Sequence, residues 1–368
     1  VFQAVDGIRD NGAGLVGSEM CIRDRCRMGY CRVGLGLIIL VTIICLPLSL
    51  SAQVTADEVL AEMNLSADEK KQIFAGEFVA GQMQSVSDRD LAISMAFLVK
   101  VPPNDLAKEV IGGELMKAND QIKAHGEISG DGSLKDLEFL NLARADDYLN
   151  AKSGNKINLD TGEIAAFKAL KGKPNAKQEA EKELHKMLLA RYQAYRKSGL
   201  SAISPYDRGK AKKTDPGKDL LLDTDAAKVL KKHVPAFQKV MVDYPKATID
   251  GLEEQFFWML YDIDGKPNYV LSHFFSAPSG NAHVVVKRQF YVANTYNVMQ
   301  EVAVFLPVKE GTLVVYVNHL STDQVAGFGG SAKRKIGGRV MTKKIKALFE
   351  KSRNVDEKLN KKHPIKEK

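Results

Sequence analysis

The sequence predicts an α+β fold in which an antiparallel sheet packs on one long C-terminal helix and carries a helical insertion. Three observations predict it. Strand-like segments come early in the chain, five more follow one another closely between residues 255 and 320, and a helical apolar pattern follows the last of them. Because the turns between these strands are short, the strands must pair antiparallel. Runs of strands separated by a helical stretch indicate α+β architecture.

The first part of the domain combines short helices with a hairpin. A helix is expected at Ala56–Met63, and Ser66 and Glu69 form a capping-box pattern that begins a second helix. The segments Glu77–Gln84 and Leu91–Val101 flank a polar turn and predict two paired strands. A further helix and a further strand are expected after them, at Asn104–Ile111 and Gln121–Ile128.

The insertion, residues 131–246, is polar and mostly helical in pattern. Its clearest helix is Lys177–Lys197, where apolar residues recur at helical spacing until Gly199 ends the pattern. An exposed loop rich in Lys, Gly and Pro and two short helices complete it, at Asp207–Lys218, Asp225–His233 and Ala236–Val242.

Five segments after the insertion are rich in Val, Phe and Tyr and are separated by turn residues. The strands expected there are Gln255–Tyr261, Tyr269–Ala277, His283–Val292, Gln300–Val308 and Thr312–Leu320. Several of these strands are apolar at both alternating sets of positions. One face can therefore pack on the C-terminal helix and the other on the insertion.

The start of the C-terminal helix has two interpretations. Ser321 and Gln324 form a capping-box pattern, which favours a start at Thr322 and places the following glycines inside the helix, at about 1 kcal/mol each. A start at Ser331 instead crowds three cations at the positive helix end, which is unfavourable without an anion. We favour the first interpretation. The apolar stripe expected along this helix is Val325, Phe328, Ile336, Val340, Ile345, Leu348 and Phe349.

This order of elements resembles the START-like, or helix-grip, superfamily over about residues 77–353. The runs Lys287–Val292 and Leu313–Asp323, with Gly327–Gly330, are also similar to an uncharacterised family of exported bacterial proteins. The superfamily resemblance implies a curved antiparallel sheet that wraps the C-terminal helix and encloses a hydrophobic ligand. The same fold also hosts enzymes and interaction modules, so the resemblance does not select one function.

The first residues do not look like part of the domain. The chain opens with Val1, and the stretch Gly14–Arg25 resembles translated sequencing-adapter DNA. We therefore interpret residues 1–27 as a sequencing artefact and Met28 as the natural start.

Residues 28–52 have the order of a secretory signal peptide. A basic residue at Arg32 precedes an apolar run at Val33–Leu50, and small residues extend to Ala52. The alternative is an uncleaved membrane anchor, because about 18 apolar residues is near the lower limit for a membrane span. We favour cleavage, and we expect a periplasmic or secreted protein with one domain at 53–353 and a disordered basic tail at 354–368.

Cysteine and histidine usage predicts no metal and no cofactor. All four cysteines precede the expected cleavage point: Cys21, Cys26, Cys31 and Cys45. No histidine pair has a metal-binding spacing such as H-E-x-x-H. His273, His283 and His319 fall on three expected strands. They either converge on one face of the sheet or lie on opposite faces, because side chains alternate and the register is unknown.

Positive charge is concentrated at the C-terminal end. Residues 321–368 hold 14 Lys and Arg against 5 Asp and Glu, whereas residues 53–320 hold 34 against 36. Such a local field attracts anionic surfaces, and export argues against nucleic acid as the partner. The alternative is a solvated helix face that serves solubility. The candidates for contact with an anionic surface are Lys333, Arg334, Lys335, Arg339, Lys343 and Lys344.

Aromatic residues crowd the five strands and supply the remaining candidates. The residues expected to line a ligand pocket are Trp258, His273, Phe290, Tyr291, Tyr316 and His319. The leading hypothesis is an exported, non-enzymatic protein that holds an apolar molecule or lipid between sheet and helix. The alternatives are an envelope-surface protein whose basic helix binds anionic lipid or polymer, and an enzyme on the same fold. No catalytic residue is predicted.

Overall fold

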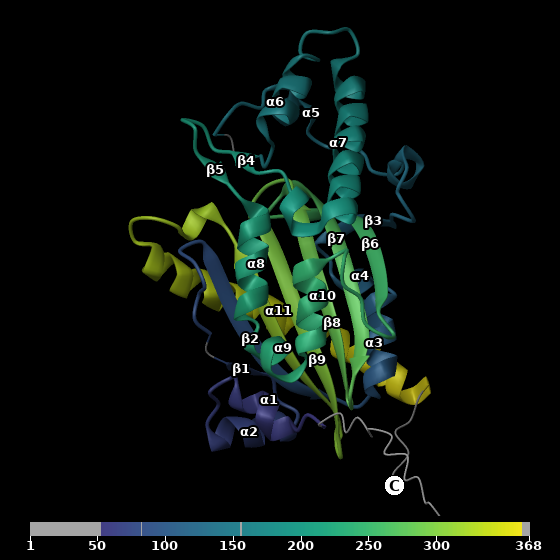
Figure 1. The fold of residues 1–368 in the computed structure, drawn as a ribbon, viewed down its shortest axis with the longest axis vertical. Coiled ribbons are helices and arrows are strands. Elements are labelled where there is room, and N and C mark those ends of the chain that lie inside the picture. Colours follow the sequence, from purple (N-terminus) through teal and green to yellow (C-terminus); the bar gives the residue numbers. More distant parts are fainter. Residues whose placement is uncertain (1–52, 82, 155–156, 363–368) are drawn as a thin grey trace, which may run out of the picture. The chain divides into compact units, whose positions relative to one another are not determined.

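The computed structural model describes residues 53–81, 83–154 and 157–362, with the side chains of 114–115 and 352–362 excepted. The fold is α+β, as predicted. An eight-stranded antiparallel sheet carries helices on both of its faces, and the described residues include eleven α-helices (Figure 1).

The sheet has the strand order β1-β2-β10-β9-β8-β7-β6-β3. Five long strands form consecutive hairpins in its centre, and the early strands β2 and β3 pair with the two ends of that meander. All eight strands predicted for this sheet are present. The strands are β1 (Val79–Gly81), β2 (Asp90–Val99), β3 (Ile122–Glu127), β6 (Glu253–Ile263), β7 (Lys266–Ser279), β8 (Ala282–Val292), β9 (Val298–Val308) and β10 (Gly311–Ser321).

One face of the sheet is covered by the N-terminal helices and by the insertion (Figure 1). The helices on this face are α1 (Ala56–Ala61), α2 (Ala67–Phe74), α5 (Ala145–Leu149), α6 (Thr161–Lys168), α7 (Ala176–Ser198), α8 (Pro216–Ala226), α9 (Lys228–His233) and α10 (Pro235–Asp243). The predicted capping box at Ser66 is confirmed at the start of α2, and Gly199 ends α7 as predicted.

The loop predicted within the insertion is partly regular structure. The segment predicted as an exposed loop, Asp207–Lys218, contains part of a small hairpin, β4 (Tyr206–Asp207) with β5 (Lys213–Thr214), and the start of α8. Helix α8 begins at Pro216 with Asp215 as its N-cap, a standard start signal. It packs against the central strands, so it contributes to the core.

The opposite face packs on three helices, α3 (Pro103–Ile111), α4 (Glu114–Ala118) and α11 (Gly330–Lys362). Leu106 and Ile111 of α3 pack in the apolar cluster on this face, and Ile345 and Phe349 of α11 border it. The two faces therefore have separate cores, and the central strands are buried on both sides.

The prediction that α11 begins at Thr322 is wrong. Thr322 caps only a 3₁₀ turn at Asp323–Val325, and Ala326 is extended. Gly327 and Gly329 then have positive φ angles of 73° and 71°, which a helix cannot contain, and α11 begins at Gly330. At its other end α11 continues to Lys362, so most of the segment expected as a disordered tail is helical.

The residues expected to form one apolar stripe on α11 do not all face the sheet. Ile345, Leu348 and Phe349 contact the sheet side, whereas Ile336 and Val340 are largely exposed. The helix lies close to β2 at Gly337, where an added Cβ would lie 3.0 Å from Leu91.

Several predictions lie outside the described residues. They are the artefact at 1–27, the signal peptide at 28–52, the four cysteines and the last six residues of the chain. Among the described residues, none of the helices has the length and hydropathy needed to cross a bilayer.

Gly199 provides a test of the junction between α7 and α10. It adopts φ 63°, and a Cβ there would overlap the carbonyl oxygen of Tyr244, whereas Gly172 has φ 83° with nothing within 4 Å of its Cβ position. We expect Gly199→Ala to lower the free energy of unfolding by roughly 4 kcal/mol or more, and Gly172→Ala by about 1 kcal/mol. Urea denaturation measures both, and equal losses would contradict the packing described.

Candidate functional site

A cavity of about 130 Å³ lies between the sheet and the helices α3, α4 and α11. Its walls are mostly aliphatic and aromatic, and they include side chains from six strands. The lining residues are Phe97, Val99, Leu106, Val110, Met116, Asn119, Ile122, Phe274, Val285, Lys287, Glu301, Ala303, Phe305, Val314, Tyr316, Ile345, Leu348 and Phe349. This is the place where the sequence predicts a ligand, between the sheet and the C-terminal helix.

A charged pair lies in the otherwise apolar wall of this cavity. Lys287 and Glu301 are directly opposite each other on β8 and β9, and Lys287 Nζ forms a short ion pair with Glu301 Oε2. Tyr316 Oη donates to Glu301 Oε1 at 2.8 Å, and Asn318 Nδ2 donates to Tyr316 Oη at 2.8 Å. Alternation along the strands explains the set, because Tyr316 and Asn318 are two residues apart on β10.

The protonation states of this cluster favour binding over acid-base chemistry. Burial alone would lower the pKa of Lys287, but the charge of Glu301 and the bonds to it raise that pKa above its ordinary value, so the ammonium stays charged. Burial, and then the Glu301 charge, raise the pKa of Tyr316 well above its usual range, so the phenol keeps its proton. A charged ammonium and a neutral phenol are hydrogen-bond donors, not nucleophiles.

Only one of the six predicted pocket residues lines the cavity, namely Tyr316. Trp258, His273, Phe290, Tyr291 and His319 lie on the opposite face of the sheet, in or beside the core that the insertion covers. Strand alternation assigns them to that face. A bulge opposite the Leu271–Ser272 step lets the adjacent residues Phe290 and Tyr291 both join the same core.

On that face these residues contact the insertion. Trp258 Nε1 donates to the carbonyl oxygen of Asp136 at 2.7 Å, and Phe290 stacks on Tyr195 with ring centroids 4.0 Å apart. His273 is fully buried and lies 3.1 Å from the Tyr195 hydroxyl. Burial lowers the pKa of His273 well below its usual value, so the ring is neutral. These contacts hold the insertion, including α7, on the sheet.

The three strand histidines do not converge. His283 lies on the face that α3 covers, where it contacts Ser276 Oγ at 2.7 Å and Asn104 Oδ1 at 3.0 Å. His273 and His319 share the other face but have separate partners, because His319 pairs with Asp90 at 3.1 Å. These three histidines therefore do not form the single cluster on one face that would have favoured an enzyme.

The six basic residues predicted to contact an anionic surface all lie on the C-terminal helix α11. Arg334 donates to the carbonyl oxygen of Asp88 at 2.8 Å, and Lys344 lies 3.8 Å from Asp264. The other four, Lys333, Lys335, Arg339 and Lys343, are exposed.

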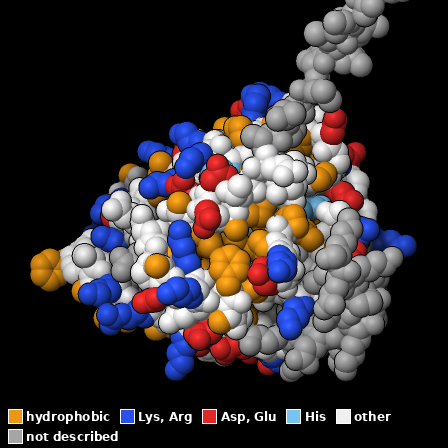
Figure 2. All heavy atoms as spheres, turned by 90° about the horizontal axis from the view of Figure 1, so that it is seen from below, with side chains coloured by type: hydrophobic (Ala, Val, Ile, Leu, Met, Phe, Trp, Pro, Cys, Tyr) orange, Lys and Arg blue, Asp and Glu red, His pale blue; other side chains and the backbone are white. Residues whose placement is uncertain are grey.

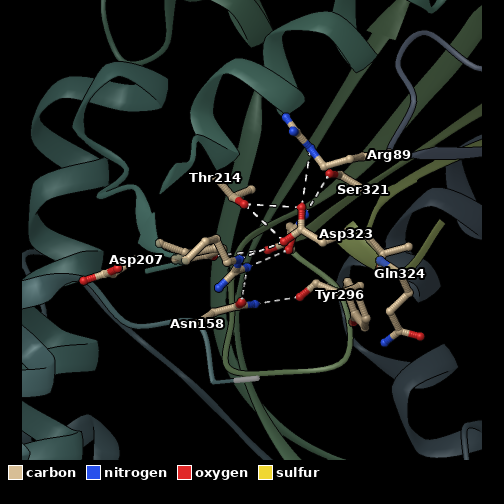
Figure 3. A network of polar contacts seen from close by, with 12 residues as sticks. Arg89, Asn158, Asp207, Thr214, Tyr296, Ser321, Asp323 and Gln324 are labelled. Atoms are coloured by element: carbon tan, nitrogen blue, oxygen red, sulfur yellow. Dashed lines mark hydrogen bonds and ion pairs between the residues drawn. The ribbon is translucent and has the colours of Figure 1, made fainter. Parts of the chain in front are cut away.

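A second, polar cleft opens at the end of the sheet, between the insertion and the turns after β8 and β10 (Figure 3). Arg208 donates to Asp323 Oδ2 at 2.8 Å, to Asn158 Oδ1 at 2.6 Å and to Asn297 Oδ1 at 3.0 Å. Asn158 also donates to the carbonyl oxygen of Tyr296 at 2.7 Å. These bonds fasten the insertion to the sheet.

Sequence reasoning missed both polar clusters, although a signal for one was present. Lys287 interrupts a run of apolar residues in a central strand, and a charge at such a position indicates a partner across the sheet. Arg208 gave no comparable signal, because its partner Asp323 is 115 residues away in the sequence and the connecting hairpin was read as a loop.

No family model, curated protein or solved structure matches this chain. The function must therefore be inferred from the cavity and from the surface of the molecule.

The Lys287–Glu301 pair makes a prediction about stability. Lys287→Met leaves the Glu301 charge without its cation, so we expect a loss of about 3 kcal/mol in the free energy of unfolding. Adding Glu301→Leu should recover most of that loss. Lys344→Met, which removes one side of an exposed pair, should change stability by less than about 0.5 kcal/mol. Denaturant unfolding measures all three, and a double variant no more stable than Lys287→Met would contradict the pairing.

Proposed function

We propose that this protein binds a small, mostly apolar molecule that carries one polar group, in the cavity between the sheet and α11. The observation that carries the proposal is an apolar cavity whose wall contains a charged and hydrogen-bonded cluster, Lys287 with Glu301 and Tyr316. Apolar walls with a few convergent polar groups are typical of ligand sites. The polar group of the ligand meets this cluster, and its apolar part meets the aromatic walls.

The strand order supports the resemblance to the helix-grip superfamily. Strand β2 is followed by two helices, α3 and α4, and β3 begins the far side of the sheet. The meander from β6 to β10 then returns to β2, and α11 follows over the face that lines the cavity. The insertion lies on the other face and contributes none of its described residues to the cavity lining.

The size of the cavity limits the ligand. An engineered cavity of about 150 Å³ in another protein accepts benzene, so 130 Å³ suits a single ring or one end of an acyl chain. A whole lipid needs more room. One wall consists of Ile345, Leu348 and Phe349 on α11, so an outward shift of this helix is the movement that would admit a longer chain. We place this function in the periplasm or outside the cell, on the basis of the predicted signal peptide.

Filling the cavity tests the proposal. Ala303 lines it, and Ala303→Phe places a ring in the space for the ligand, whereas Ala165→Phe adds the same ring at an exposed position of α6. With indole and octanoate as probes, titration calorimetry should detect binding to the unaltered chain and to Ala165→Phe, and at least tenfold weaker binding to Ala303→Phe. Equal binding by all three proteins, or no binding of either probe, would contradict the proposal.

A second candidate function, docking on an anionic membrane surface, is favoured by the exposed side of α11. Phe328, just before the helix begins, is completely exposed, and Ile336 and Val340 on the helix are 62% and 51% exposed. Ile336 and Val340 are four residues apart on the helix, with basic residues on both sides of them. An apolar strip bordered by cations is typical of helices that lie in a membrane interface.

The start of α11 strengthens this candidate. Its first turn contains no acidic residue, and Lys333, Arg334 and Lys335 lie close to its positive end. That arrangement is unfavourable unless an anion offsets it. In Figure 2, basic side chains lie near a hydrophobic side chain that projects from the left edge, the side where Figure 1 shows the start of α11. A bilayer with anionic headgroups supplies both the charge and the apolar interior.

Vesicle binding tests whether the exposed side of α11 docks on membranes or only keeps the protein soluble. We expect binding to vesicles that contain phosphatidylglycerol, weakened by salt, and at least about tenfold weaker for the triple variant Phe328→Ser, Ile336→Ser, Val340→Ser, because each exposed apolar side chain gains energy on burial. The matched control is Phe139→Ser with Leu134→Ser, two exposed apolar residues of the insertion. If the triple variant binds vesicles as well as the unaltered chain, the exposed apolar residues do not contribute and the contact is purely electrostatic. If salt does not weaken binding, the basic residues of α11 do not hold the protein on the membrane.

A further inference from the structure

A buried group of three metal-binding side chains lies on the insertion side of the sheet, away from the cavity and from the exposed side of α11. Asp90 at the start of β2, Asp223 on α8 and His319 on β10 each place one ligand atom within 4.8 Å of the others. Their exposed fractions are 1%, 2% and 2%. Strand pairing and helix packing assemble the group, since β2 pairs with β10 and α8 packs over β10.

The polar atoms of this group are incompletely satisfied. Asp90 Oδ2 accepts from the backbone N–H of Val86 at 2.8 Å and lies 3.1 Å from His319 Nδ1. Within the described residues, Asp90 Oδ1, Asp223 Oδ2 and His319 Nε2 are buried without a hydrogen-bond partner. A buried polar atom without a partner is unfavourable, so the cluster lacks a partner. An ion that contacts both oxygens of each carboxylate would satisfy Asp90 Oδ1 and Asp223 Oδ2, whereas His319 Nε2, on the other edge of the ring from Nδ1, is not explained by it.

Neighbouring cations do not supply that partner directly. Asp219, one turn before Asp223 on α8, is paired with Arg89 at 2.8 Å and accepts from Ser321 Oγ at 2.6 Å. The charge of Arg288 acts on Asp223, but the donors of Arg288 go to Gln300, Tyr195, Thr224 and the carbonyl oxygen of Met241. Of the two aspartates that α8 turns towards the sheet, only Asp219 therefore has a guanidinium bonded to it.

We propose that Asp90, Asp223 and His319 bind a divalent first-row metal ion, of the zinc or manganese class, that fastens α8 to the sheet. Two carboxylate oxygens and one imidazole nitrogen are ligands that these ions accept. Bonds of about 2.1 Å place neighbouring ligand atoms roughly 3–3.5 Å apart. His319 Nδ1 lies 3.1 Å from Asp90 Oδ2, within that spacing, and 3.9 Å from Asp223 Oδ1, a few tenths of an ångström beyond it.

Protonation of Asp223 is the competing explanation, and pH separates the two. Burial raises the pKa of Asp223 to about 8, Asp90 and Asp219 add to the rise, and His319 and Arg288 oppose it. A folded pKa above the unfolded value of about 3.9 means that stability falls as pH rises from about 4 to 8. A bound metal requires the carboxylate form, so its stabilising effect must grow over the same range.

The test uses the full chain, unfolded with a chelator and refolded without metal. Calorimetry with Zn²⁺ and Mn²⁺ should find one ion bound per chain, and that ion should raise Tm by roughly 5 °C at pH 8 and by much less at pH 5.5. Asp223→Asn and His319→Gln should each lower metal affinity at least tenfold. Asp225→Asn, an exposed aspartate on the same helix, should leave it unchanged.

The contrary result is equally specific. If neither ion changes Tm at pH 8 and Asp223→Asn stabilises the protein there, Asp223 holds a proton and the metal proposal is wrong. If Asp225→Asn weakens binding as much as Asp223→Asn, the ion binds elsewhere. Should His319→Gln fail to fold, Asp223→Asn, which preserves side-chain size and removes the charge, still decides the outcome.

Discussion

Burial of the central strands on both faces is the constraint on which the rest of this structure depends. Helices cover each side of the meander, so neither alternating set of side chains faces water. A charged residue in such a strand must find its partner within the protein. The polar clusters of this molecule are consequences of that requirement, and they are the places where its chemistry is concentrated.

Strand β8 shows the constraint most clearly. Lys287 and Arg288 are adjacent in sequence and therefore point to opposite faces. Lys287 meets a carboxylate, Glu301, on the cavity side. Arg288 is fully buried on the insertion side, where it bonds to neutral oxygens, including those of Gln300 and Tyr195. On the cavity side, Lys287 is neutralised by direct contact with Glu301. On the insertion side, Arg288 has no carboxylate among its hydrogen-bond partners in the described residues.

Much of the fold follows from sequence pattern, and the exceptions have local causes. The strands and the helices α2 and α7 are predicted because periodicity, capping residues and glycines agree there. The start of α11 is missed because Thr322 caps a single 3₁₀ turn that ends at the extended residue Ala326, and positive φ angles at Gly327 and Gly329 delay the helix further. A capping pattern identifies a first turn, and the residues after it decide whether the helix continues.

Most site residues could not be predicted because strand register decides which face a residue occupies. Tyr316 is the one predicted pocket residue on the cavity side, and the bulge beside β8 places both Phe290 and Tyr291 on the other. Asp90, Asp223 and His319 come together only through long-range pairing, at separations that no local motif records. A charge within an apolar strand, as at Lys287, is the sequence signal that could have identified the polar cluster beside the cavity.

The most direct test of the central claim is a crystal structure of the protein grown with a brominated medium-chain fatty acid. The account predicts anomalous bromine density among Phe97, Phe305 and Phe349, with the carboxyl group directed towards Lys287 and Tyr316. Bromine density on the insertion side of the sheet alone, or a cavity filled by its own side chains with no ligand bound, would contradict it.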